Sequence, residues 1–461
     1  MLRCLLAIAI LFLGYEGFFL LPRWMVVIPG AFRMSDALLL SVPLLLLFFF
    51  RRVAQAVRAW PQAAFLVLFG FALFLLTPLL AQANFDQPYL RGLVALRLNA
   101  TYLLYFVFAA IIANPRELMK FVRWITVFLA IYLFLLVLAK YFPRLDIVYP
   151  PKADWYFNAA FRRYGEHRLF FPYGLVPAVF FFLALTHFLY GAKSPESGRH
   201  FRKLQFLYML LFAYCIMKTG TRILVFSIPL VCLIAVMESR NRKLMVLAGL
   251  LFAAVLLYDV SAPLLRGSDL GNSRLGRMLF QNSQLKAETG RELQHRMYME
   301  NFLRYPLAGA GTLIPEKSLD TRRAYARFGI FPADDTGFSK MAGEYGLLGI
   351  VWVLWFFVFC FRKTTSILRR MPPGSEGSAP FLVTKALRYY YMFLLLTFVT
   401  LPHFLRPEGI IITMLSLAML RAAEQGALEL GRAVQQPLLQ AAGQADAELS
   451  KGRRAIGYAT Q

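Results

Sequence analysis

Two adjacent carboxylates, Asp334 and Asp335, stand where a polar stretch of the chain gives way to a hydrophobic segment. Acidic side chains favour the first turn of a helix, because its free N–H groups and positive dipole end stabilise negative charge. A carboxylate at the edge of a partly dehydrated cavity can instead act as a general base, since burial and nearby cations tune its pKa. Both interpretations stay open, and one residue can cap the helix while the other reacts.

Three arginines are candidates for binding an anion. Arg222 lies in the short polar turn KTGTR between two apolar runs, where a charge at the membrane boundary is costly. It either extends into the lipid headgroups or marks a substrate pathway. Arg291 opens the segment RELQHRMYMENFLRY, which has helical spacing, and Arg168 ends an earlier polar stretch. For these two, the alternative is a solvated cation on the surface.

The composition indicates which elements must position these residues. Hydrophobic residues make up 59% of the chain, phenylalanine occurs 44 times, and the mean hydropathy is +0.56. These values exceed those of ordinary soluble domains, so we predict an all-α integral membrane protein. The four cysteines lie in apolar runs and the histidines form no HExxH pattern. We therefore expect no disulfide framework, no bound metal and no cofactor.

A spanning helix needs about 20 mostly apolar residues. The first apolar run follows a single basic residue, Arg3, and has no clear small-residue cleavage site, so we interpret it as a retained helix. About twelve transmembrane helices are predicted in all, near 4–21, 37–50, 62–81, 92–113, 124–142, 169–190, 204–217, 223–237, 243–259, 341–361, 381–401 and 409–423.

Orientation follows from the lysines and arginines of the short connections, which favour the cytoplasmic side. The basic connections are 51–58, 115–123, 193–203, 238–243 and 362–370, and they alternate with poorly charged ones such as 82–89 and 402–409. Both termini are therefore predicted to be cytoplasmic. This topology, with the anionic inner leaflet, accounts for most of the net charge of +25 without a nucleic-acid partner.

The predicted spans and connections divide the chain into four parts. Residues 1–259 hold the first nine helices and include an outer loop at 143–168. Residues 260–340 form a large, partly helical outer loop before the tenth helix, and residues 341–423 hold the last three helices. Residues 424–461 form a cytoplasmic tail, predicted to be loosely ordered or an interfacial helix. Long loops with their own aromatic and charged residues are usually functional or disordered.

Several motifs, taken in series, resemble those of the O-antigen ligase and polymerase superfamily. They are KTGTR, then GRELQH and YPLAGAG between 290 and 311, then DDTGFSKMAGEYGLLG, and the resemblance covers roughly residues 140–365. Members share a many-helix membrane fold with one large periplasmic loop before a late helix. The PLAGAG motif is intact, whereas His295 replaces the usual Trp and Asp335 stands at the position of the ligase His. Glu344 and Gly346 follow in register.

The resemblance implies glycosyl transfer on the periplasmic face of the bacterial inner membrane, from a polyprenyl-diphosphate-linked glycan. Asp335 would take the proton of the acceptor hydroxyl in an inverting, metal-independent reaction. Arginine suits the donor because its planar fork makes paired, charge-assisted hydrogen bonds to phosphate oxygens. The candidate pyrophosphate ligands are Arg168, Arg222 and Arg291. The candidates for acceptor binding or support are Asp334, His295 and Glu344.

Three activities fit these features. Because the ligase-type His is absent, we favour a polymerase that joins lipid-linked repeat units of O-antigen, capsule or exopolysaccharide. The first alternative is a ligase that transfers the glycan to lipid A core. The second belongs to a different class, a flippase for lipid-linked oligosaccharides, which would transport its substrate among the membrane lipids without making a bond.

Overall fold

The computed structural model describes residues 2–15, 18, 27–28, 32–141, 162–163, 166–167, 175–191, 199–219, 222–239, 290–314 and 336–458. Within these ranges the chain is helical apart from two antiparallel pairs of two-residue strands. Strand β1 (Val27–Ile28) pairs with β2 (Phe32–Arg33), and β3 (Arg162–Arg163) pairs with β4 (Glu166–His167). The prediction of an all-α membrane protein is confirmed.

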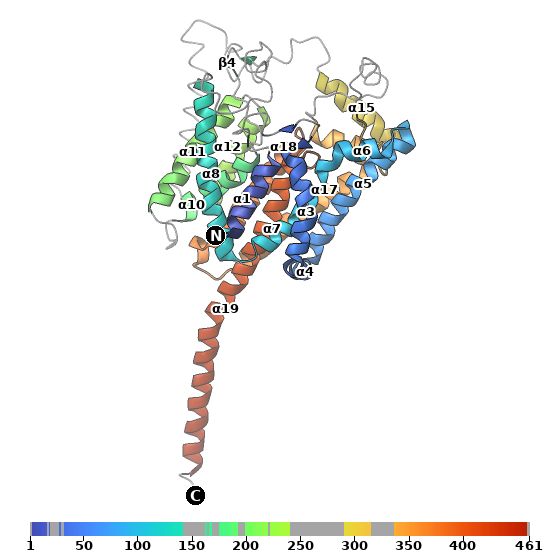
Figure 1. Cartoon of the computed structure of the whole chain (residues 1–461). Coiled ribbons are helices and arrows are strands. Elements are labelled where there is room, and N and C mark those ends of the chain that lie inside the picture. Colours follow the sequence, from blue (N-terminus) through green and yellow to red (C-terminus); the bar gives the residue numbers. More distant parts are fainter. Residues whose placement is uncertain are drawn as a thin grey trace.

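The helices follow one another along the chain with mostly short connections where both neighbours are described (Figure 1). In chain order they are α1 (Leu2–Gly14), α3 (Met34–Phe48), α4 (Phe50–Ala59), α5 (Pro61–Phe85), α6 (Tyr89–Leu96), η2 (Arg97–Leu103), α7 (Leu104–Ile111), α8 (Pro115–Tyr141), α10 (Leu175–Tyr190), α11 (Arg199–Thr219), α12 (Arg222–Glu238), α15 (Gly290–Arg304), α17 (Gly337–Arg370), η7 (Ser375–Gly377), α18 (Ala379–Phe398) and α19 (Pro407–Tyr458).

Eleven of the twelve predicted ranges overlap these helical segments, and the range 243–259 lies outside the described residues. Six spans in the described part are long and apolar enough to cross a membrane, and the bent pair α3–α4 would make a seventh. Three further apolar helices, at Leu2–Gly14, Leu175–Tyr190 and Phe226–Glu238, are shorter. The protein is therefore multi-pass, while the count of twelve stays a prediction.

The range 92–113 was predicted as one helix, but it is divided into α6, the 3-10 helix η2 and α7. Polar residues interrupt the apolar run in η2, whose sequence is RLNATYL. Arg97 directs its guanidinium to the buried carboxylate of Asp36 at the start of α3, with Nε–Oδ1 and Nη2–Oδ2 distances of 2.6 and 2.9 Å. This paired hydrogen bond fixes the interrupted span against α3.

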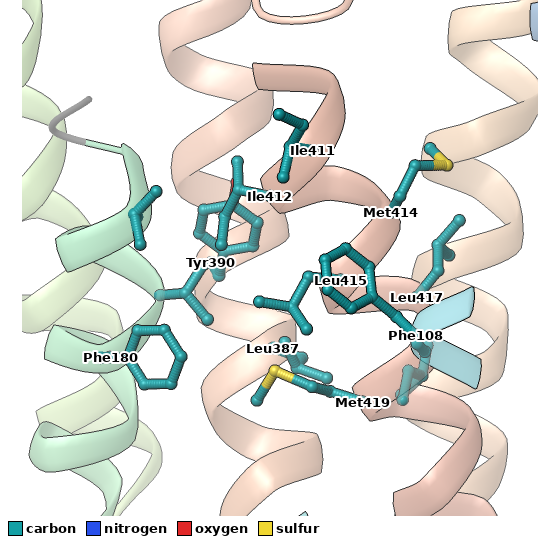
Figure 2. Close-up of a cluster of buried hydrophobic side chains, with 14 of the residues drawn as sticks. Phe108, Phe180, Leu387, Tyr390, Ile411, Ile412, Met414, Leu415, Leu417 and Met419 are labelled. Atoms are coloured by element: carbon teal, nitrogen blue, oxygen red, sulfur yellow. The ribbon is translucent and has the colours of Figure 1, made fainter. Parts of the chain in front are cut away.

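The core lies around α18 and α19, with α7 and α10 on their flanks (Figure 2). Phe180 of α10 faces Leu387 and Tyr390 of α18, and Leu415 of α19 lies beside them. These side chains are at most 1% exposed. Inside a bilayer such contacts stabilise mainly by close van der Waals packing, because the surrounding lipid is as apolar as the side chains.

Two helices extend beyond this core. Helix α15 packs against α17 and lies at one end of the bundle (Figure 1). Helix α19 continues without a break through residue 424, where the tail was predicted to begin, and projects from the opposite end (Figure 1).

Candidate functional site

The PLAGAG segment inserts into a break in α17, and we call this contact the motif junction (residues 305–312 with 343–348). Helix α17 departs from helical geometry at Gly346, where φ is 61° and ψ is −154°. In an uninterrupted helix the amides of Leu347 and Leu348 would bond to the carbonyls of the residues four positions earlier. Here both amides and both carbonyls bond to the PLAGAG segment instead. The bonds run from Ala310 N to Gly343 O (2.9 Å), Gly311 N to Glu344 O (3.1 Å), Leu347 N to Pro306 O (2.8 Å) and Leu348 N to Leu307 O (3.1 Å).

Glycine permits this insertion for two reasons, backbone conformation and space. Gly309, Gly311 and Gly346 have φ values of 79°, 86° and 61°, in the left-handed region that side chains other than glycine rarely adopt. A Cβ atom on Gly309 would lie 2.4 Å from the backbone carbon of Glu344. A Cβ atom on Gly346 would lie 2.4 Å from the amide nitrogen of Gly309. The two segments can approach this closely only because these positions lack side chains.

Glu344 is the candidate site residue that the junction holds most firmly. Its side chain is buried, it accepts a hydrogen bond from Thr312 Oγ1 at 2.9 Å, and Lys340 Nζ lies 3.8 Å from its other oxygen. A buried carboxylate is costly unless it is paired and hydrogen-bonded, so these contacts explain how the charge is tolerated. Glu344 therefore links α17 to the PLAGAG segment.

Sequence inspection missed the residues that hold the junction from the side of α5. Asn84 Nδ2 donates to Ala310 O at 3.2 Å, and Gln87 Nε2 donates to Thr312 O at the same distance. The side-chain oxygen of Gln87 also accepts from Ile314 N at 2.8 Å. The sequence QANFDQPY (82–89) contains three amide side chains in a short, poorly charged connection, and this is the feature from which these contacts could have been predicted.

The other predicted site residues lie at or beyond the edge of the described part. His295 is exposed on α15. Arg291 lies in the first turn of α15 and Arg222 begins α12, but the side chains of both lie outside the described residues. The remaining candidates also lie outside them, namely Arg168, Asp334 and Asp335. The structure therefore joins Glu344 to the PLAGAG motif and leaves the proposed base and cations untested.

The start of α17 is tightly packed against the turn at 399–406. A Cβ atom on Gly337 would lie 2.0 Å from Phe398 O, at the end of α18, and 2.5 Å from Leu401 O in the turn. Thr336, the residue before the helix, is buried, and its hydroxyl has no hydrogen-bond partner within the described part of the chain. This N-terminus therefore lacks the side-chain cap that a threonine often supplies.

The turn at 399–406 contains a buried histidine that sequence inspection had not selected. His403 Nε2 lies 2.7 Å from Thr397 Oγ1. Burial, together with the charge of Arg406, lowers the pKa of His403 to about 3. The imidazole is therefore neutral at pH 7, because its charged form would lose its hydration and would be repelled by Arg406.

No family model matches this sequence, and no curated protein matches it. Assignment to the O-antigen ligase and polymerase superfamily therefore stays a prediction from the quoted motifs.

Proposed function

We propose that the protein is a glycosyltransferase of the bacterial inner membrane that acts on the periplasmic side. It transfers a glycan from a polyprenyl-diphosphate donor to an acceptor hydroxyl, and its preferred activity is polymerisation of O-antigen, capsule or exopolysaccharide repeat units. In this topology both termini are cytoplasmic, the α15 end of the bundle faces the periplasm, and twelve helices cross the membrane.

The motif junction is the observation that carries this proposal. The two strongest motifs of the resemblance, PLAGAG and the EYG at 344–346, are about 35 residues apart in sequence but share backbone hydrogen bonds. Their contact supports the interpretation of both as parts of one site.

The packing of α15 on α17 supports the inclusion of Arg291 in the proposed site. Tyr298 of α15 packs on Gly343, where a Cβ atom would lie 2.8 Å from the Tyr298 carbonyl oxygen, and Pro306 is bonded to Leu347. Helix α15 therefore packs against the part of α17 that precedes the break at Gly346. Arg291 precedes Tyr298 by about 10 Å of helix, and α17 begins about 9 Å before Gly343. Asp335 comes two residues before that start.

In the proposed reaction Asp335 accepts the proton of the acceptor hydroxyl as its oxygen attacks the anomeric carbon of the donor. The bond from that carbon to the diphosphate oxygen breaks, the electron pair leaves with the diphosphate, and the anomeric configuration inverts. Arg168, Arg222 and Arg291 stabilise the developing negative charge, and fixed cations do so strongly where water is excluded. Glu344 positions the PLAGAG segment, while Asp334 and His295 support acceptor binding.

The experiment uses purified protein reconstituted with a lipid-linked oligosaccharide, first alone and then with lipid A core, and measures product masses. Longer glycans from the donor alone would establish a polymerase. Products that form only with lipid A core would establish a ligase. Donor that reaches the opposite leaflet with unchanged mass would establish a flippase and overturn the proposal.

Variants test the assigned residues. Arg291→Gln is expected to lower the rate about 10²–10³-fold, by analogy with the loss of an oxyanion-hole donor. Asp335→Asn is expected to lower the rate about 10²–10⁴-fold, which is the usual contribution of a general base. The matched control is Arg296→Gln, because Arg296 is an exposed arginine of the same helix whose partner is Glu300, 3.3 Å away. If both variants insert and fold but retain the wild-type rate, the assignment of these residues is wrong.

A further inference from the structure

A second candidate site lies at the end of the bundle opposite α15, where α3 bends sharply into α4 (Figure 1). The two helices meet at an angle of 82°. The bend leaves a hollow of about 510 Å³ beside the start of α1, and we call it the arginine hollow. Its lining residues are Arg3, Leu47, Phe48, Phe49, Phe50, Arg51 and Arg52.

The arginine hollow is positively charged, because three of its lining residues are arginines and none is acidic. Arg51 is exposed. Arg52 is half-buried and donates one hydrogen bond, from Nη1 to Ala110 O at 3.3 Å. Arg3 Nη1 lies 2.6 Å from Glu117 Oε1, so its charge is partly balanced. Since a guanidinium has five N–H donors, each arginine that makes one such bond keeps donors for a further ligand.

The rim of the arginine hollow is apolar. Leu44 and Leu47 on α3, and Phe48 and Phe50 at the bend, are all more than 60% exposed. On a membrane helix such side chains face lipid acyl chains. Helix α4 instead exposes Arg51 and other polar residues, while its Ala56 is buried. A short helix with these two faces suits the plane of the membrane interface.

We infer that the arginine hollow binds the headgroup of an acidic phospholipid. The phosphate would take paired, charge-assisted hydrogen bonds from Arg51 and Arg52, and the acyl chains would lie along the apolar rim on α3. A free phosphate would accept hydrogen bonds from the arginines, but it has no apolar part that could contact Leu47 and Phe48. The cations and the apolar rim together therefore favour a lipid. This inference does not depend on the proposed glycosyl transfer, because the motif junction lies beside α15, at the other end of the bundle.

The test measures lipid retention by native mass spectrometry of the full-length protein. The protein is purified in detergent with phosphatidylglycerol or with phosphatidylcholine of the same acyl chains. Wild-type protein is expected to retain phosphatidylglycerol preferentially. Arg51→Gln should lower that retention about tenfold, because a hydrogen bond to a charged group contributes about 1.5 kcal/mol. The double variant Arg3→Gln/Arg51→Gln should lower it further.

The matched control is Arg58→Gln, which removes the same charge from the same helix outside the arginine hollow. It is expected to leave phosphatidylglycerol retention within twofold of wild type. An equal loss in Arg58→Gln and Arg51→Gln would overturn the site, because it would indicate diffuse surface charge.

Two further measurements exclude other occupants. Addition of millimolar inorganic phosphate should not displace phosphatidylglycerol, and displacement would mean that the arginine hollow takes free phosphate. Size-exclusion chromatography with light scattering should show the same oligomeric state for every variant. A change from dimer to monomer without a change in lipid retention would make this surface a contact between two copies. Because Arg51 is exposed, its substitution is not expected to unfold the protein. The same chromatography checks that each variant folds.

Discussion

The motif junction and the arginine hollow are built in different ways. At the junction, four hydrogen bonds join backbone atoms, and glycines with positive φ allow two chain segments to approach closely. At the arginine hollow, long side chains that are mostly exposed or half-buried surround a hollow, and the backbone bends sharply between two helices. The junction therefore tolerates almost no change in shape, whereas the arginine hollow tolerates changes in shape but not in charge.

The largest predicted effect is at Gly309. Gly309→Ala should lower the free energy of unfolding by roughly 3 kcal/mol, of which about 1–2 kcal/mol is the cost of a left-handed conformation and the rest is overpacking against Glu344. The control is Gly374→Ala, because Gly374 has φ of 83° but its Cβ would meet nothing within 4 Å. Thermal unfolding in detergent, followed by intrinsic fluorescence, compares the two. Equal losses would show that close approach at the junction costs nothing beyond backbone strain.

A slightly smaller effect is expected from the buried carboxylate of the junction. Glu344→Ala should destabilise the protein by about 2 kcal/mol, because Lys340 and Thr312 Oγ1 each lose a partner in a largely buried place. A double-mutant cycle with Lys340→Met measures the coupling between the two charges. The double variant should be less destabilised than the sum of the single variants. Strict additivity would mean that the 3.8 Å ion pair contributes no measurable stability.

Acidic pH should lower the stability of the folded protein through His403 and should leave the arginine hollow unchanged. His403 lies in the turn at 399–406, beside the start of α17. Burial lowers its pKa from 6.5 to about 3, so the imidazole is neutral in the folded state. Below pH 6.5 the unfolded chain binds a proton that the folded chain does not, and stability falls as pH decreases towards 3. The loss is about 1.4 kcal/mol per pH unit in that window.

The measurement compares apparent melting temperatures of wild type and His403→Asn between pH 7.5 and 5. The variant should be less stable at pH 7.5, where the hydrogen bond to Thr397 is lost, but should decline less steeply as the pH falls. Parallel curves would indicate that His403 is not the group responsible. The arginine hollow should be insensitive over this range, because arginine does not lose its proton.

The sequence predicted the helices well, because hydrophobic runs are a local property. It also identified both halves of the junction, PLAGAG and Glu344, as motifs. It could not predict that Gly346 opens α17, since that break is stable only when the PLAGAG segment supplies four replacement hydrogen bonds.

Long-range partners explain the other misses. The division of residues 92–113 into three segments accompanies the pairing of Arg97 with Asp36, which precedes it by 61 residues. The pKa of His403 depends on burial in the folded protein. No local pattern in PHFLRPEG announces that burial, so this histidine could be identified only from the fold.

The smallest effect on stability is predicted for the arginine hollow, and this completes the contrast with the junction. Arg51→Gln should change the free energy of unfolding by less than about 0.5 kcal/mol, as is usual for exposed residues away from the core. Its melting temperature should equal that of Arg58→Gln in detergent without acidic lipid. Phosphatidylglycerol should then raise the melting temperature of Arg58→Gln more than that of Arg51→Gln, because a ligand that binds only the folded state stabilises it by mass action. If acidic lipid stabilises both variants equally, the charge at this bend contributes no binding site.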